Sequence, residues 1–254
     1  AGNGTQGYYG DEGPAIDACL SLPTGLAIDR DGNIFIADTD NHIIRKVSGG
    51  IISTYAGIPS SSGFDGDNDI AVNAQLNSPK GLSINDEGGL FIVDQGNNKI
   101  RRINSSEIIS TVVSELTSPV AVHATKNGEL YFIDSNSVQK VDANGLVARV
   151  TSVTNNPGSN WFRFPPEKAV FVFVSSVAVL SENALVVSDS YNHAIKMVDL
   201  NGTTVTIAGD NQGSLANGLN ALNTKLSYPR AITVMNDEIY FADFGNHCIR
   251  KIDV

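Results

Sequence analysis

One segment of the sequence recurs along the whole chain and limits what it can fold into. In Phe35 to Val47 an apolar stretch ends at an aspartate, a polar turn follows, and a second stretch alternates apolar and basic residues. The pattern returns three times in full, and once, over 131–141, with a shortened turn. The aspartates that mark the five copies, 40 to 56 residues apart, are Asp38, Asp94, Asp134, Asp189 and Asp243. Self-similarity at such a period is typical of propellers and solenoids.

Each copy predicts a blade of short antiparallel strands. In the first copy, the segment 30–33 is a hairpin turn of the Asp-Gly type, and 48–50 leads into a fourth strand over 51–56. Four strands per repeat are typical of a propeller blade. We therefore predict an all-β propeller of five blades, which forms a single domain over residues 1–254. The predicted blades cover about 23–57, 79–113, 119–150, 176–209 and 229–254, and 1–22 is a closing segment and loop.

The composition argues against several classes of function. Apolar residues make up 41 % of the 254 residues, and there are 24 glycines, which suits a turn-rich β-protein. No apolar run approaches the roughly 20 residues of a membrane-spanning helix, so we predict no membrane insertion. The net charge of −10 opposes nucleic-acid binding, because such binding relies on Lys and Arg to neutralise phosphates.

The repeats resemble the NHL repeat, which is named after Asn-His-Leu. The resemblance rests on the turn sequences, which are Asn41-His42-Ile43, Asn192-His193-Ala194 and Asn246-His247-Cys248, with Asn97-Asn98-Lys99 as a departure. It implies a β-propeller, commonly of six blades, so part of a six-bladed propeller is the alternative fold. NHL propellers serve as protein-binding platforms, extracellular sensors, RNA readers and, in one branch, a zinc-dependent amidating lyase. Fold alone does not choose among these functions.

The histidines test the lyase alternative. His42, His193 and His247 share one repeat position, so they diverge from one another in a propeller, and His123 stands alone. A zinc site needs ligands that converge on one metal. We therefore predict no metal, no cofactor and no catalytic residues.

The acidic residues are predicted to be structural. Each repeat aspartate lies where a strand enters a turn, and Asp side chains there commonly bond to backbone amides just ahead. We therefore interpret Asp38, Asp94, Asp134, Asp189 and Asp243 as turn caps. The stretch 65–69, Asp-Gly-Asp-Asn-Asp, superficially resembles a calcium loop but lacks the closing glutamate.

Two cysteines suggest a covalent clasp. By alignment, Cys19 lies in the loop that precedes blade one and Cys248 lies in blade five. A closed ring would bring these blades together, so we predict a Cys19–Cys248 disulfide, which would stabilise the fold by about 4 kcal/mol for so long a loop. The alternative is two unrelated thiols, since disulfides need an oxidising compartment.

Two further kinds of surface site are predicted. Asn3, Asn104 and Asn201 begin Asn-x-Ser/Thr sequons and are candidate N-glycosylation sites, which favour an extracellular or cell-surface location. Aromatic residues in the long connection before blade four form a candidate partner-binding cluster, and packing over the propeller is the alternative. The cluster comprises Trp161, Phe162, Arg163 and Phe164.

The fifth copy provides three strands, which leaves an unpaired edge. Natural sheets usually pair or cover such edges. A longer chain, another segment of this chain or a neighbouring copy would each supply the missing strand, and serial donation between copies would build a filament. We predict a non-catalytic extracellular propeller for protein interaction or assembly. The alternatives are an enzyme of the peptidyl-amidating-lyase type and a ligand-sensing propeller.

Overall fold

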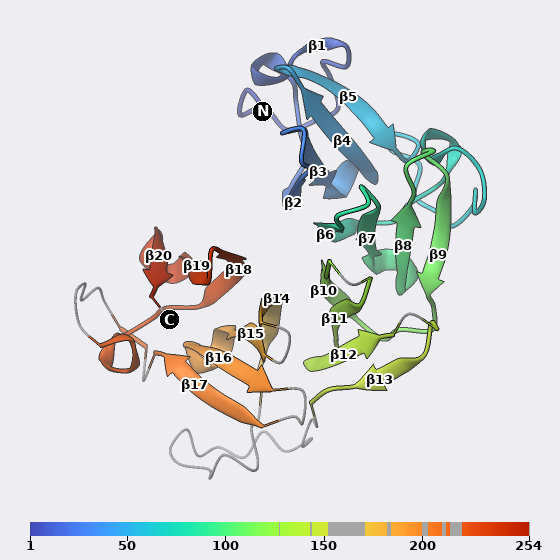
Figure 1. Ribbon diagram of the computed structural model, residues 1–254. Coiled ribbons are helices and arrows are strands. Elements are labelled where there is room, and N and C mark those ends of the chain that lie inside the picture. The colour runs from blue at the N-terminus through green and yellow to red at the C-terminus, as the bar shows by residue number, and fades with distance from the viewer. Residues whose placement is uncertain are drawn as a thin grey trace. The chain divides into compact units, whose positions relative to one another are not determined.

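The structure is a computed structural model that describes residues 1–126, 128–142, 144–151, 171–181, 184–199, 203–209, 212–213 and 220–253. Within these ranges the chain forms five antiparallel sheets, with short 3-10 turns between strands and in the loops before some of the blades (Figure 1). The fold is an all-β propeller of five blades, as predicted, and the last sheet has three strands. No helix in these ranges has the length and apolar content that crossing a membrane requires.

The chain divides into two compact units, Ala1–Leu130 and Tyr131–Val254; the single domain over 1–254 stays a prediction. Sheet one has the order β1-β5-β4-β3-β2, with β1 Gly13–Pro14, β2 Pro23–Ile28, β3 Ile34–Asp38, β4 Ile43–Ser48 and β5 Ile51–Ala56. Sheet two has the order β6-β7-β8-β9, with β6 Pro79–Ile84, β7 Leu90–Asp94, β8 Lys99–Ile103 and β9 Ile109–Val113.

The later sheets follow the same up-and-down order. Sheet three runs β10-β11-β12-β13, with β10 Pro119–Ala124, β11 Leu130–Asp134, β12 Ser137–Val141 and β13 Val147–Arg149. Sheet four runs β14-β15-β16-β17, with β14 Val174–Ser181, β15 Ala184–Asp189, β16 Ala194–Asp199 and β17 Thr204–Ala208. Sheet five runs β18-β19-β20, with β18 Pro229–Met235, β19 Glu238–Asp243 and β20 Cys248–Ile252.

Sheet one contains a strand that the repeat pattern did not predict. The two-residue strand β1 pairs with β5 and lies on the outer edge of the blade (Figure 1). It comes from the loop that precedes blade one, so this loop folds back over the last strand of the blade that follows it.

In blades one to four the second strand is almost entirely buried, because both of its faces are covered. In the first unit β2 lies beside β6, so the faces of blades one and two pack together. Phe35 of β3 and Leu82 and Ile92 of blade two share one buried cluster. A strand covered on both faces reads as a continuous apolar run rather than an alternating one.

The Asn-His turn has a backbone conformation that explains its sequence. The 3-10 turns η2 (Thr39–Asn41), η4 (Gln95–Asn97), η6 (Ser190–Asn192) and η8 (Phe244–Asn246) each follow a repeat aspartate. The next residue is left-handed in every case, with φ of 58° at His42 and 53° at Asn98. Asn and His tolerate this region better than β-branched residues do. Blade three instead turns through Ser135 and Asn136, both at positive φ, as in a two-residue hairpin.

The remaining 3-10 turns are η1 Ala15–Asp17, η3 Ala71–Asn73 and η7 Ala221–Asn223. They lie in the loops before blades one, two and five. Backbones also approach closely between blades one and two, where a Cβ at Gly25 would overlap the carbonyl oxygen of Lys80. Glycine is required there because any side chain would force the two blades apart.

Candidate functional site

The repeat aspartates tie each turn back to the loop before its blade. Asp38 accepts a hydrogen bond from the Ser21 amide at 2.6 Å through Oδ1, and one from Asn41 Nδ2 at 2.8 Å through Oδ2. Burial raises the pKa of Asp38, although the bonds from Asn41 and Ser21 and the charge of Arg45 act in the opposite direction. In blades two, four and five the corresponding acceptor–donor pairs are Asp94 with Asn77 and Asn97, Asp189 with Val172 and Asn192, and Asp243 with Ser227 and Asn246.

These bonds differ from the turn caps that the sequence suggested. In none of these four blades does the aspartate side chain cap a backbone amide of the 3-10 turn just ahead of it. The turn uses its own atoms instead, as where the His42 amide donates to the Thr39 carbonyl. Asp134 of blade three is also buried, and its main-chain carbonyl accepts a bond from Ser137 Oγ.

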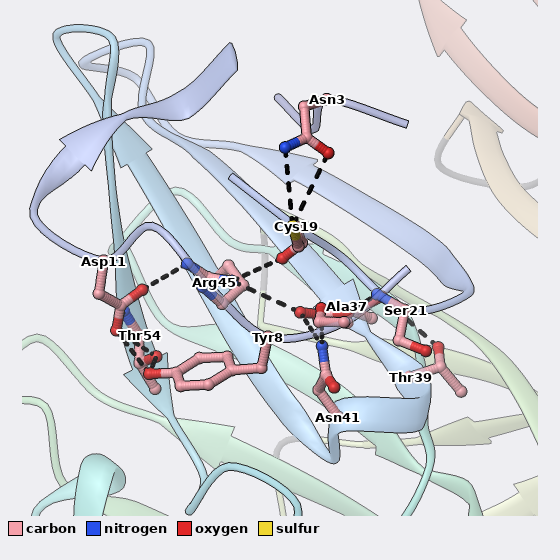
Figure 2. Close-up of polar contacts among 12 residues, drawn as sticks. Asn3, Tyr8, Asp11, Cys19, Ser21, Ala37, Thr39, Asn41, Arg45 and Thr54 are labelled. Atoms are coloured by element: carbon pink, nitrogen blue, oxygen red, sulfur yellow. Dashed lines mark hydrogen bonds and ion pairs between the residues drawn. The ribbon is translucent and has the colours of Figure 1, made fainter. Parts of the chain in front are cut away.

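A fully buried arginine lies beneath the turn of blade one (Figure 2). Arg45 Nη1 is 3.6 Å from Asp38 Oδ2, and Nη2 forms an ion pair with Asp11 of the preceding loop. The Tyr8 ring lies 5.1 Å from the guanidinium carbon, and Thr54 Oγ1 donates to Asp11 at 2.7 Å. Two carboxylates thus compensate one buried charge, as a buried ion must be compensated.

Blade two repeats this arrangement. Arg101 is also fully buried; it is 2.8 Å from Asp67 and 3.4 Å from Asp94, with Phe64 as the aromatic neighbour at 4.9 Å. Thr111 donates to Asp67 at 2.7 Å. Sequence reasoning missed this network, although the equivalent positions of Asp11 and Asp67 in the two loops were a usable signal.

The loop that resembled a calcium site is used in the same way. Asp67 faces Arg101, while Asp65 and Asp69 accept bonds from the backbone amides that follow them. No group of three or more His, Cys, Asp or Glu suited to a metal occurs among the described residues.

Two of the repeat histidines bind a backbone amide of the next blade. His42 Nδ1 accepts a bond from the Ser78 amide at 3.0 Å, and His193 Nδ1 accepts one from the Tyr228 amide at 3.1 Å. The acceptor role requires an unprotonated Nδ1. Burial lowers the pKa of His193, although the charges of Asp243 and Asp189 oppose this shift. These imidazoles therefore link successive blades.

The structure describes both cysteines of the predicted disulfide and two of the three predicted glycosylation sites. Cys19 and Cys248 carry free, half-buried thiols and lie in different units, so their pairing stays a prediction. Asn3 Nδ2 donates to the Asp17 carbonyl at 3.1 Å and lies 3.6 Å from Cys19 Sγ (Figure 2). Asn104 is exposed, and its Oδ1 accepts two amide bonds of its own turn. Outside the described residues lie Asn201, Trp161, Phe162, Arg163 and Phe164.

Sheet five ends in a free edge within the described ranges. Strand β20 pairs with β19, and no described strand lies beyond it. Ile249 of β20 is 71 % exposed, whereas Ile44 and Ile100 at the same repeat position are fully buried. Among the described residues, Ile249 is thus an exposed apolar side chain on the outermost strand of sheet five.

Comparison with known proteins identifies relatives over nearly the whole chain. A profile of the Teneurin NHL domain matches residues 56–116 and 114–254, and an NHL repeat profile matches 20–46. Teneurin-4 of Mus musculus is 34 % identical over 137 residues, 48 % of this chain and 5 % of that protein. Teneurin-1 of Gallus gallus is 24 % identical over 248 residues, 80 % of this chain and 9 % of that protein. Protein SUPPRESSOR OF QUENCHING 1, chloroplastic, of Arabidopsis thaliana is 25 % identical over 285 residues, and the match covers 99 % of this chain and 26 % of that protein.

Solved structures show the same fold at lower identity. A chain of a nidogen/laminin complex has a TM-score of 0.65 at 17 % identity, covering 93 % of this chain and 79 % of its own length. Virginiamycin B lyase from Staphylococcus aureus has a TM-score of 0.56 at 17 % identity, with 91 % and 84 % covered. At such identities the likeness concerns the fold alone. The chain spans only a small part of the length of the teneurins it matches.

Proposed function

Since the chain belongs to the family of teneurin NHL domains, we propose that it is a non-catalytic, extracellular propeller that serves as a protein-interaction or assembly module. The free edge of β20 carries this proposal. Its main-chain groups pair with an added strand, and the exposed Ile249 beside them supplies apolar contact. A second copy of the chain is one donor, and serial donation of this kind builds rings or filaments.

The contacts of the Asp and His side chains, which are the residue types that often act in catalysis, support a non-catalytic role. The carboxylates of Asp11, Asp38, Asp67 and Asp94 are engaged by buried arginines, and His42 and His193 are engaged by backbone amides. A nucleophile or general base needs a free, correctly placed group near a substrate. The likeness to a lyase lies in the fold and does not favour the enzyme alternative.

The test of assembly is light scattering after size exclusion, over a range of protein concentrations. We expect the average mass to rise with concentration, and Ile249→Lys to reduce association about tenfold, because a charge beside an edge strand opposes pairing. Ile16→Lys is the matched control, since Ile16 is 72 % exposed and lies in the first unit. A chain that stays monomeric at the highest concentration would remove self-assembly from the proposal.

The extracellular location is tested by intact mass with and without reduction and glycosidase. The Cys19–Cys248 disulfide predicts no free thiol in the unreduced protein and a mass gain of two hydrogen atoms on reduction. Occupied sequons at Asn3, Asn104 or Asn201 predict a mass that falls with glycosidase. Two titratable thiols together with an unmodified mass would contradict the proposed location.

A further inference from the structure

The loop before blade one covers the outer edge of that blade. Strand β1 of this loop pairs with β5, the Glu12 amide donates to the Ile52 carbonyl at 2.8 Å, and the Ala15 amide donates to the Gly50 carbonyl at 2.8 Å. We call residues 11–18 the strap of blade one. The strap satisfies main-chain groups that an outer strand would otherwise expose.

Blade two has an equivalent strap, residues 67–74. The Asn68 amide donates to the Ile109 carbonyl at 2.7 Å, and the Ile109 amide donates to the Asp69 carbonyl at 3.0 Å. Ile70 forms an isolated bridge with Ile108, so this strap also runs antiparallel to the outer strand. Two blades thus cover the same edge in the same way.

Each strap brings a carboxylate and two alanines to its blade. In blade one, Asp11 binds Arg45, while Ala15 and Ala18 pack on Ile52. The corresponding residues of blade two are Asp67, Arg101, Ala71, Ala74 and Ile109. Both straps therefore have the pattern Asp-x-x-x-Ala-x-x-Ala.

Blade three lacks a strap in the described part of the chain. Strand β9 ends at Val113 and β10 begins at Pro119, so the loop between them is too short to reach an outer edge. Val147 pairs with Val141 in the register at which Ile52 pairs with Val47 in blade one. Ile52 is 0 % exposed beneath its strap, and Val147 is 41 % exposed. The only described neighbour of β13 is β12.

The basic residue at this register also lies on a different strand in blade three. In blade three, Gln139 of β12 pairs with Arg149 of β13. In blades one and two, the same registers pair Arg45 with Thr54 and Arg101 with Thr111. The basic residue has thus moved from the buried inner strand to the exposed outer one, where the strap carboxylate meets Thr54 in blade one.

We propose that the outer edge of β13, residues 146–149, binds an extended acidic segment of a partner protein. The segment adds a strand beside Val147, places its carboxylate on Arg149 and lays small apolar residues on Val147, as the straps do at the equivalent positions of their own blades. The straps that cover the equivalent edges of blades one and two indicate what kind of segment fits here, and the positive charge of Arg149 favours an acidic one. The inference rests on the proposed role as an interaction module but uses an edge other than that of β20.

The probe is a fluorescein-labelled peptide of residues 64–75, which contains the whole strap of blade two. We expect saturable binding by fluorescence anisotropy. Arg149→Glu should weaken binding about fivefold, as an exposed ion pair is worth roughly 1 kcal/mol. Arg149→Lys should retain most of the affinity. Arg30→Glu, at an exposed arginine of blade one, should leave the affinity for the peptide unchanged. The peptide that carries Asp67→Lys should bind the unchanged protein no more tightly than the original peptide binds the Arg149→Glu variant.

Hydrogen exchange locates the bound peptide. Protection that appears at 146–149 on binding supports the inference, and Val147→Pro, which removes an edge amide, should abolish it. Protection already present in the free protein would overturn it, because the chain itself would then cover the edge. No saturable binding, or protection at 248–252 instead, would also overturn it. Light scattering tests the other proposal separately. If the protein does not self-associate but still binds the peptide, only assembly through β20 is contradicted.

Discussion

Blade one buries an arginine between two carboxylates, whereas blade three has a glutamine at the same position. The difference follows the straps. Arg45 is compensated by Asp38 of its own blade and by Asp11 of the strap, whereas the short loop before blade three forms no strap and its one carboxylate, that of Glu115, is exposed. A buried charge that lacks its partners costs several kcal/mol, so a neutral residue such as Gln139 is the stable choice there. The comparison of blades one and three therefore indicates that a buried charge at this repeat position depends on the loop that precedes the blade.

The largest difference between the two blades is expected on deleting the buried cation. Arg45→Ala leaves Asp38 and Asp11 without their common partner and should lower the free energy of unfolding by about 3–5 kcal/mol. Gln139→Ala removes no charge and should cost about 1 kcal/mol or less. Urea denaturation followed by circular dichroism measures both. Equal losses would show that the strap and the arginine are not coupled.

The apolar residue beneath the strap should show the next largest effect. Ile52→Ala opens a cavity under Ala15 and Ala18 and should destabilise the protein by about 2–5 kcal/mol. Val147→Ala, at the equivalent uncovered position, should change stability by about 0.5 kcal/mol. Thermal or urea unfolding of the pair tests this expectation. A large loss for V147A would mean that Val147 is covered in solution.

Acid should destabilise blade three before blade one. Burial lowers the pKa of His123 in β10 from 6.5 to about 4. The unfolded chain therefore takes up a proton that the folded blade does not, and stability falls as the pH drops from about 6.5 to about 4, by up to about 3 kcal/mol. Hydrogen exchange of β10 and β12 against pH measures this, and His123→Leu should flatten the profile.

Asp11 gives blade one a different acid limit. Burial raises the pKa of Asp11, but the bonds from Thr54 and Tyr8 and the charge of Arg45 outweigh it, so the pKa is lowered overall. Its contribution is present above the ordinary value of 3.8 and is lost as the pH falls through the lowered pKa. Exchange in β5 should thus stay slow at pH 5, where β10 already opens. Simultaneous opening would contradict this order.

The smallest effect is expected from the hydroxyl that holds the strap carboxylate. Thr54→Val removes the bond to Asp11 and should cost about 1 kcal/mol. Arg149→Thr places the corresponding hydroxyl on blade three, where no described carboxylate meets it, and should be neutral within about 0.5 kcal/mol. Urea denaturation at pH 7 distinguishes the two. A destabilised R149T would indicate that Arg149 already has a partner.

The repeat predicted the blades well because its signals are local. The apolar run before Asp38, the Asp-Gly hairpin and the Asn-His turn each depend on neighbours in sequence, and the strands lie where these signals placed them, with β4 beginning one residue after His42. The left-handed φ of His42 is the physical basis of the turn sequence.

The site was predicted less well because it depends on distant residues. The carboxylate of Asp38 was expected to bind amides just ahead, yet it bonds to Ser21, 17 residues earlier. The strap pairing of Gly13 with Ile52 has no local signature, since a two-residue strand shows no periodicity. Only the alignment of Asp11 with Asp67, read together with the buried arginines, could have indicated that these loops fold back.

The straps also have an expected consequence for the order in which the blades are completed during folding. The Thr54 amide meets Asp11 across 43 residues of sequence, so the outer edge of blade one closes only after a long chain segment has been drawn together. In blade three, the Val138 amide finds Thr151 across 13 residues. Loop-closure entropy grows with this separation, and low contact order is associated with fast folding. We therefore expect the outer strand of blade three to join its blade before the strap closes the edge of blade one.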